Sequence, residues 1–112
     1  MDDIQAALCE RFGAEFQPCA PHLKLGIAMA TLNQAPINGL RHPPQGDTTG
    51  WYIWGGQEFS PAEDFFQSLH VVHLEELLPT AIRYLGLPPA WRFQVANCHE
   101  DVWFDANLLN DS

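Results

Sequence analysis

The residues that could bind a metal form two small groups of histidine and cysteine. His70 and His73 lie three positions apart before an expected helix, and Cys98 and His99 are neighbours near the C-terminus. Zinc sites favour closely spaced pairs such as Cys-x-x-Cys or His-x-x-x-His, and neither spacing occurs in this chain. The simpler interpretation is that His73 begins the helix and His70 forms local hydrogen bonds. We therefore predict no metal and no other cofactor.

Hydrolytic chemistry has equally little support. It needs a nucleophile, a base and an oxyanion hole, and no serine here lies in a recognisable nucleophile motif. On a strand, the neighbouring side chains of Cys98 and His99 would diverge. Paired acids such as Glu75-Glu76 are usually solvated surface, and Gly55-Gly56 lacks the later glycine and the lysine of a phosphate loop. We expect a protein that is not an enzyme; a small enzyme of unknown chemistry, with or without a His/Cys metal site, is the alternative.

Composition and charge narrow the possible partners. The chain has 112 residues, of which 46% are hydrophobic and 17% charged, which predicts a single globular domain over residues 1–112. Its formal net charge of −9 argues against nucleic acid or an anionic membrane as partner, because both require a basic footprint. The charge suits a basic protein partner, and solubility alone is the competing explanation.

Cysteine usage and the N-terminus predict a cytoplasmic protein. The three cysteines, Cys9, Cys19 and Cys98, are an odd number without a Cys-x-x-Cys pair, as expected for reduced thiols. The chain begins Met1-Asp2-Asp3, which has the wrong charge for a signal peptide, and no apolar run approaches the ~18 residues of a membrane span.

The first half of the chain predicts one helix and two strands. Asp2 or Asp3 caps a helix that runs to about Phe12, with Ile4, Leu8 and Phe12 on one face and Gly13 as its stop. Residues 25–32 form an apolar run that fits a strand or a buried helix, and we favour the strand. The Pro- and Gly-rich residues 33–48 predict a long irregular connection, and residues 50–55 predict a central strand because both of its faces are aromatic.

The second half predicts short helices and two further strands. Residues 60–63 resemble a capping box before a short helix over 64–67, and residues 73–84 have a helical period that Pro79 should break. Residues 91–96 and 102–104 predict neighbouring strands. The fold class is therefore α+β: a mostly antiparallel sheet with a central aromatic strand, packed by the N-terminal helix and the short helices.

Acidic residues flank aromatic ones at several positions, an arrangement that would suit a surface that binds a basic partner. The competing interpretation is that these aromatics belong to the core and the acids only face water. From Gly50 to Asp105 only Arg83 and Arg92 oppose eight acids. The aromatics of the central strand and of residues 91–93 are better explained as core. The binding residues that we predict lie in two acidic patches, one of them beside phenylalanine: Glu58, Phe59, Glu63, Asp64, Glu100 and Asp101.

A series of phrases in fixed order resembles a known family. The phrases are PINGLRHPP, GDTTGWYIWGG, DFF followed by LHVVHLEE, YLGLPP, WRF and EDVWFD. Together they cover roughly residues 4–109 and resemble the Imm33-type immunity proteins of bacterial polymorphic toxin systems. The chain departs from the family pattern at Leu77-Leu78, where Trp-Cys is expected, and at Ala90, where glycine is usual.

The resemblance implies a function that the residues alone do not. It implies a small cytoplasmic protein, encoded beside a toxin, that binds the toxin to protect the producing cell and its kin. It brings no catalytic residues. We expect inhibition by occupancy, in which an acidic face covers the toxin's active or substrate-binding surface; an unrelated interaction adaptor is the further alternative.

Overall fold

The described residues fold into one sheet with three α-helices on one of its sides. The computed structural model describes residues 2–56 and 66–109, and within them six strands join in the order β4-β1-β3-β2-β5-β6. Neighbouring strands are antiparallel except for β1 and β3, which are parallel. The strands are β1 (Lys24–Ile27), β2 (Ile37–Arg41), β3 (Thr48–Gly55), β4 (Gln67–His70), β5 (Trp91–Ala96) and β6 (His99–Phe104). This arrangement confirms the predicted α+β class.

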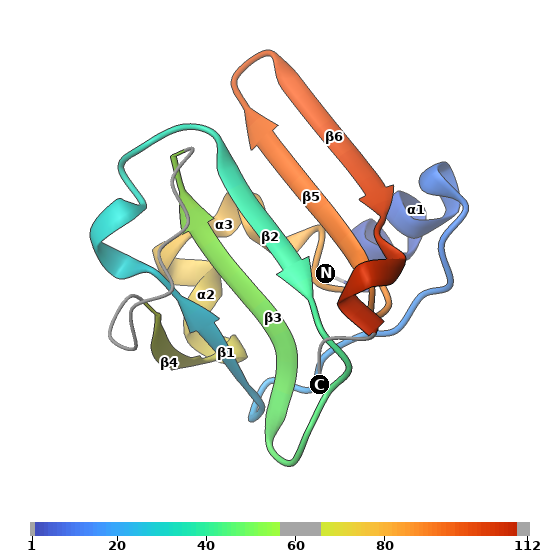
Figure 1. Cartoon of the computed structure of the whole chain (residues 1–112), viewed down its shortest axis with the longest axis horizontal. Coiled ribbons are helices and arrows are strands. Elements are labelled where there is room, and N and C mark those ends of the chain that lie inside the picture. The colour runs from blue at the N-terminus through green and yellow to red at the C-terminus, as the bar shows by residue number, and fades with distance from the viewer. Residues whose placement is uncertain (1, 57–65, 110–112) are drawn as a thin grey trace.

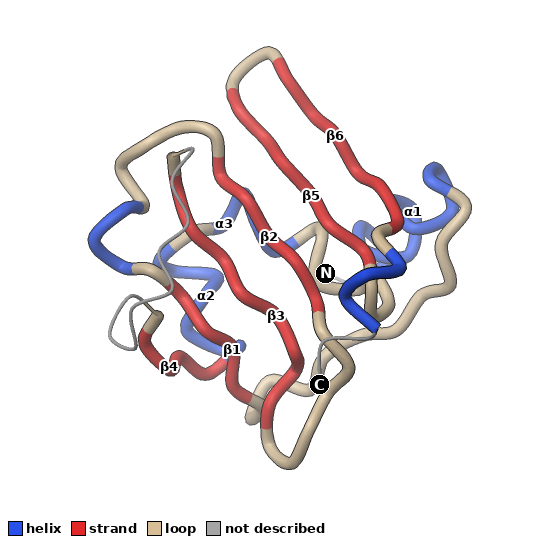
Figure 2. Tube along the Cα trace, in the orientation of Figure 1, coloured by secondary structure: helices blue, strands red, loops and turns tan. Residues whose placement is uncertain are grey.

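The three α-helices, α1 (Asp2–Phe12), α2 (Val71–Leu77) and α3 (Pro79–Ile82), lie behind the sheet in the view of Figures 1 and 2. There are also two short 3-10 helices, η1 (Met29–Thr31) and η2 (Ala106–Leu109), and η2 lies in front of the sheet, where Leu108 packs with Leu40 and Trp54. Pro79 separates α2 from α3, as predicted, because a proline cannot continue the hydrogen bonds of the preceding helix. Among the described residues, no helix is long and apolar enough to cross a membrane.

The aromatic strand is central, as predicted, with β1 on one side and β2 on the other. Its Trp51 and Ile53 are almost fully buried against the helices, where Trp51 packs on Phe93. Helix α1 adds Leu8 and Cys9 to this core, whereas Ile4 is 60% exposed. The apolar face of α1 is therefore buried at Leu8 and exposed at Ile4.

The irregular connection predicted over residues 33–48 was wrong, because it contains β2. This strand pairs with β3 and β5 at once, so its conformation comes from two neighbours rather than from its own composition. Gly39 is needed at its centre because a β-carbon there would lie 2.1 Å from the Phe93 ring. Pro36 and Pro43 lie just outside the strand, where their missing N–H groups cost no ladder bond, and the Pro36 carbonyl accepts from the Gly56 N–H at 2.8 Å.

Two shorter predictions also need correction. The strand predicted over residues 25–32 ends at Ile27, and Met29–Thr31 form η1 instead. The helix predicted over residues 64–67 starts outside the described residues, and its last residue, Gln67, begins strand β4. The Gln67 backbone pairs with Ile27 of β1, so tertiary pairing decides its conformation.

A buried arginine ties β2 to three other segments. Arg41 is 4% exposed, and its guanidinium donates to the carbonyl oxygens of Thr49 at 2.9 Å, Gln17 at 2.9 Å and Leu87 at 2.7 Å. Burial lowers the pKa of Arg41, since the charged form loses hydration. Hydrogen bonds to the three carbonyl oxygens replace much of that hydration. Through these bonds Arg41 connects β2 to β3, to the link after α1 and to the loop after α3.

We predict that Arg41→Lys lowers the free energy of unfolding by about 3 kcal/mol, because one ammonium group cannot reach three carbonyls that converge on a planar guanidinium. Urea unfolding followed by tryptophan fluorescence measures the change. Arg83→Lys on the exposed surface is the matched control and should stay within about 0.5 kcal/mol. Equal effects at the two positions would contradict the role given to Arg41.

Gly50→Ala should cost about 3 kcal/mol, the sum of left-handed backbone strain and overpacking. Gly50 has φ +89°, and a β-carbon there would lie 1.9 Å from the His42 carbonyl oxygen. Gly46→Ala is the control, with φ +59° and no atom within 4 Å of the added carbon, and should cost about 1 kcal/mol. Equal urea midpoints for the two variants would contradict the close contact with His42 as the main cause of the loss at Gly50.

Candidate interaction surface

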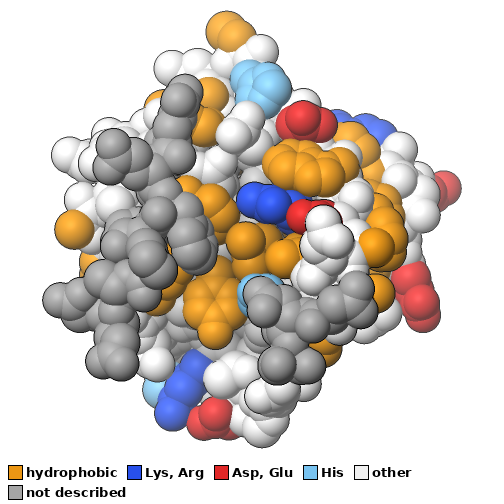
Figure 3. All heavy atoms as spheres, in the orientation of Figure 1, with side chains coloured by type: hydrophobic (Ala, Val, Ile, Leu, Met, Phe, Trp, Pro, Cys, Tyr) orange, Lys and Arg blue, Asp and Glu red, His pale blue; other side chains and the backbone are white. Residues whose placement is uncertain are grey.

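The face of the sheet opposite the three α-helices is a mixed aromatic and polar surface, which we call the open face. Figure 3 looks onto it and shows hydrophobic side chains beside charged ones. Strand alternation and register place its residues there. They are Asn38, Leu40, Tyr52, Trp54, Arg92, Gln94, Asp101 and Trp103, of which Asn38, Leu40 and Trp54 are buried.

Tyr52 is the exposed aromatic at the centre of the open face. It is 38% exposed and meets Phe66 edge to face at 5.2 Å and His42 at 5.6 Å between ring centroids. Trp54 beside it is only 5% exposed. The prediction that the aromatics of β3 are core is therefore right for Trp51 and Trp54 and wrong for Tyr52.

A polar row crosses the open face from β2 to β6. The Asn38 amide donates to the Gly56 carbonyl at 2.7 Å and accepts from Gln94 Nε2 at 3.0 Å. Gln94 Oε1 lies 3.1 Å from His99 Nε2. Because these side chains bond to one another, the row fixes the β5–β6 hairpin against β2, although this hairpin extends beyond the end of β2 (Figure 1).

The hairpin carries one partly buried ion pair on the open face. Arg92 Nη1 lies 3.2 Å from Asp105 Oδ2, and the guanidinium lies 5.4 Å from the Trp103 ring centroid. The buried Nε of Arg92 has no hydrogen-bond partner among the described residues. Asp101, next to Trp103 along β6, is exposed and forms no ion pair within the described part of the chain.

Glu100 and Asp101, predicted as one patch, point to opposite faces of the sheet. The Glu100 carboxylate pairs with Arg11 of α1 and accepts a hydrogen bond from the Tyr84 hydroxyl at 2.5 Å. Burial, followed by the Glu100 bond and charge, raises the pKa of Tyr84. Glu100 thus fastens α1 to the sheet while Asp101 faces solvent on the other side.

The remaining four predicted site residues precede strand β4 in the sequence. Glu58, Phe59, Glu63 and Asp64 lie outside the described residues, in the segment that joins β3 to β4. That segment returns to the described chain at Phe66, which packs on the open face against Tyr52 and Trp54.

The candidate metal and nucleophile residues are not assembled into a site. The rings of His70 and His73 lie 6.2 Å apart, and no three His, Cys, Asp or Glu residues of the described chain gather as metal ligands would. Burial raises the pKa of the Cys9 and Cys19 thiols, which makes them poorer nucleophiles. Cys98 lies exposed in the β5–β6 turn.

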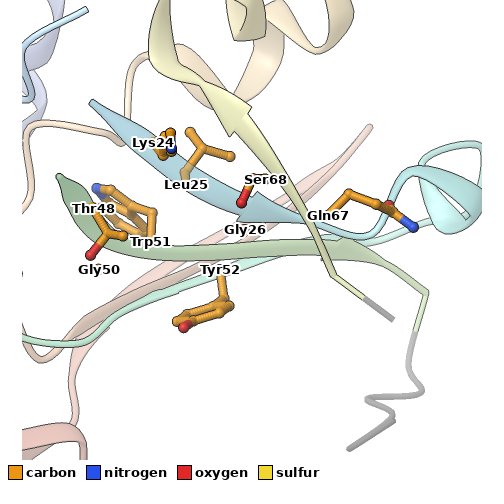
Figure 4. A pocket seen from close by; sticks show the side chains of 9 residues that line it. All are labelled: Lys24, Leu25, Gly26, Thr48, Gly50, Trp51, Tyr52, Gln67 and Ser68. Atoms are coloured by element: carbon orange, nitrogen blue, oxygen red, sulfur yellow. The ribbon is translucent and has the colours of Figure 1, made fainter. Parts of the chain in front are cut away.

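A small pocket lies where β1 and β3 shift register (Figure 4). Its volume of about 110 Å³ would hold about three or four water molecules. Trp51 and Tyr52 leave β3 on opposite sides beside it, and the one charged residue among its described lining, Lys24, pairs with Asp47 at 3.1 Å. This lining offers no set of convergent catalytic groups.

Comparison with known families identifies the chain. The model of the Imm33-like domain matches residues 4–105, so the protein belongs to the Imm33-like family, an immunity protein family, and the resemblance read from the sequence is confirmed. No curated protein and no solved structure matches. The structure gives a physical reason for the glycine expected at Ala90, because this residue has φ 80°, in the region that favours glycine.

The variants Glu100→Gln and Asp101→Asn should differ in their free energy of unfolding, because the two neighbouring carboxylates have different contacts. We expect Glu100→Gln to cost about 1 kcal/mol, because it weakens both the Arg11 pair and the Tyr84 hydrogen bond at a partly exposed site. Asp101→Asn should stay within about 0.5 kcal/mol. Thermal and urea unfolding at neutral pH measure both; a larger loss for Asp101→Asn would contradict this assignment.

Proposed function

We propose that the protein is an immunity protein that binds a cognate bacterial toxin domain and neutralises it by covering its active or substrate-binding surface. The observation that carries this proposal is the match of residues 4–105 to the Imm33-like domain. The described residues add no assembled catalytic or metal site that would favour an enzyme. The protein would act in the cytoplasm of the producing cell.

The use of basic residues within the fold supports a basic partner. Arg11, Lys24 and Arg92 each pair with a carboxylate, and Arg41 is buried. Of the five basic side chains, only Arg83 is exposed without such a pair among the described residues. Most of the net charge of −9 therefore remains available to attract a positively charged protein surface. The same charge disfavours nucleic acid and anionic membranes.

We propose two contact regions on the protein. The first is Asp101 with the open face around it, to which Glu100 adds charge from the other side of β6. The second is the segment with Glu58, Phe59, Glu63 and Asp64, which continues into Phe66 on the same face. Aromatic residues are enriched in binding hot spots, and carboxylates around them would steer a basic partner to the site.

Co-expression tests the function directly. The toxin domain encoded beside this gene should stop growth when expressed alone, and co-expression of this protein should restore growth and allow the two chains to be purified together. A variant with Glu58, Glu63, Asp64 and Asp101 reversed in charge, in which Glu100 keeps its contacts with Arg11 and Tyr84, should fail to rescue. Wild-type protein that neither rescues growth nor binds the toxin domain would overturn the proposal.

A single charge reversal should slow capture of the toxin. Asp101→Lys is expected to lower the association rate about tenfold at low ionic strength, and the difference should shrink as salt screens the charge. Glu75→Lys, an exposed residue of α2 behind the sheet, makes the same change in net charge and should have a much smaller effect. Stopped-flow binding at two salt concentrations measures both; equal rates for the two variants would contradict an interface near Asp101.

A further inference from the structure

Strand β6 is one edge of the sheet, and one of its two hydrogen-bonding sides has no strand partner in the described part of the chain. Ala96 pairs with His99 across the Asn97-Cys98 turn, and the Asp105 N–H donates to the Ala90 carbonyl at 2.7 Å. Antiparallel pairing alternates, so the odd-numbered residues of β6 turn their backbone groups toward β5. The N–H and C=O groups of Glu100, Val102 and Phe104 therefore point away from the sheet.

These outward groups have no backbone partner among the described residues. Proteins usually shorten or cover exposed strand edges, because unpaired groups are a template for another strand. The opposite edge strand, β4, has four residues, whereas β6 has six and ends in Phe104, which is 52% exposed. The edge of β6 is therefore the better template for an added strand.

The side chains along β6 favour a particular occupant. Asp101 and Trp103 face the open side of the sheet, whereas Val102 and Phe104 face the helix side. An added strand would have alternate residues beside Asp101 and beside Phe104, which favours a basic residue at one and an apolar residue at the other. A second copy of this chain would bring another net charge of −9 to the same edge, so charge disfavours self-association.

We propose that an extended basic segment of the toxin domain adds to β6 as a further antiparallel or parallel strand. The inference rests on the proposed function and specifies how the partner is held. Backbone hydrogen bonds to Glu100, Val102 and Phe104 hold the segment. Its side chains alternate between the two faces, so contacts with Asp101 and Phe104 favour a segment with a basic residue at one position and an apolar residue at the other.

Hydrogen exchange followed by NMR tests the strand addition in the wild-type protein. In the free protein, the amides of Glu100, Val102 and Phe104 should exchange rapidly, while those of Asp101 and Trp103 are protected by β5. Saturation with the toxin domain encoded beside the gene should slow exchange of the outward amides at least tenfold. Unchanged exchange at all three amides in the complex would overturn the inference.

A matched pair of variants separates the backbone from the side chain. Phe104→Pro removes an outward N–H and leaves the β5 hydrogen bonds intact, whereas Phe104→Ala removes the ring and keeps the N–H. We expect Phe104→Pro to bind the toxin domain at least tenfold more weakly than Phe104→Ala. If Phe104→Pro does not fold, the exchange measurement on the wild type decides the question.

The outcomes distinguish this inference from the proposed function. A wild-type complex with exposed outward amides and equal affinities for the two variants overturns strand addition and leaves the immunity function standing. Absence of any complex overturns both. A homodimer of the isolated protein that already protects these amides also overturns the inference, because the edge is then occupied by a second copy.

Discussion

The buried guanidinium of Arg41 is the interaction on which the arrangement of the sheet depends. Its three carbonyl acceptors belong to the link after α1, to β3 and to the loop after α3, so one side chain joins segments that are far apart in sequence. Its backbone carbonyl also accepts from the Ala90 N–H at 2.7 Å, just before β5. This junction positions β5 and thereby the β5–β6 hairpin, which carries the proposed binding surface.

Four of the five basic side chains are engaged in contacts within the molecule: Arg41 is buried, and Arg11, Lys24 and Arg92 pair with carboxylates. Arg41 satisfies backbone carbonyls, Arg11 fastens α1 to Glu100, and Arg92 holds Asp105 beside Trp103. A net charge of −9 then costs some stability through self-repulsion, which is the expected cost of a surface that attracts a basic partner. The basic residues held in these contacts stabilise the fold and leave an acidic surface for the proposed partner.

The sequence predicts those elements whose conformation depends on neighbouring residues in the chain. The helix that ends at Phe12, the break at Pro79 and the strands β3 and β5 follow from capping, proline chemistry and alternation. Strand β2 escapes prediction because its glycine and flanking prolines favour turns, and only pairing with two neighbours overrides them. The role of Glu100 escapes for a similar reason, since its partner Arg11 lies 89 positions earlier.

The central claim is that the protein acts by occupancy and not by catalysis. Titration of a fixed amount of active toxin domain with this protein, followed by intact-mass measurement of the recovered toxin, tests it most directly. The account predicts inhibition that is complete at a fixed stoichiometric ratio, is reversed when the complex is separated, and leaves the mass of the toxin unchanged. Inactivation of many toxin molecules by each molecule of this protein, or a changed toxin mass, would contradict it.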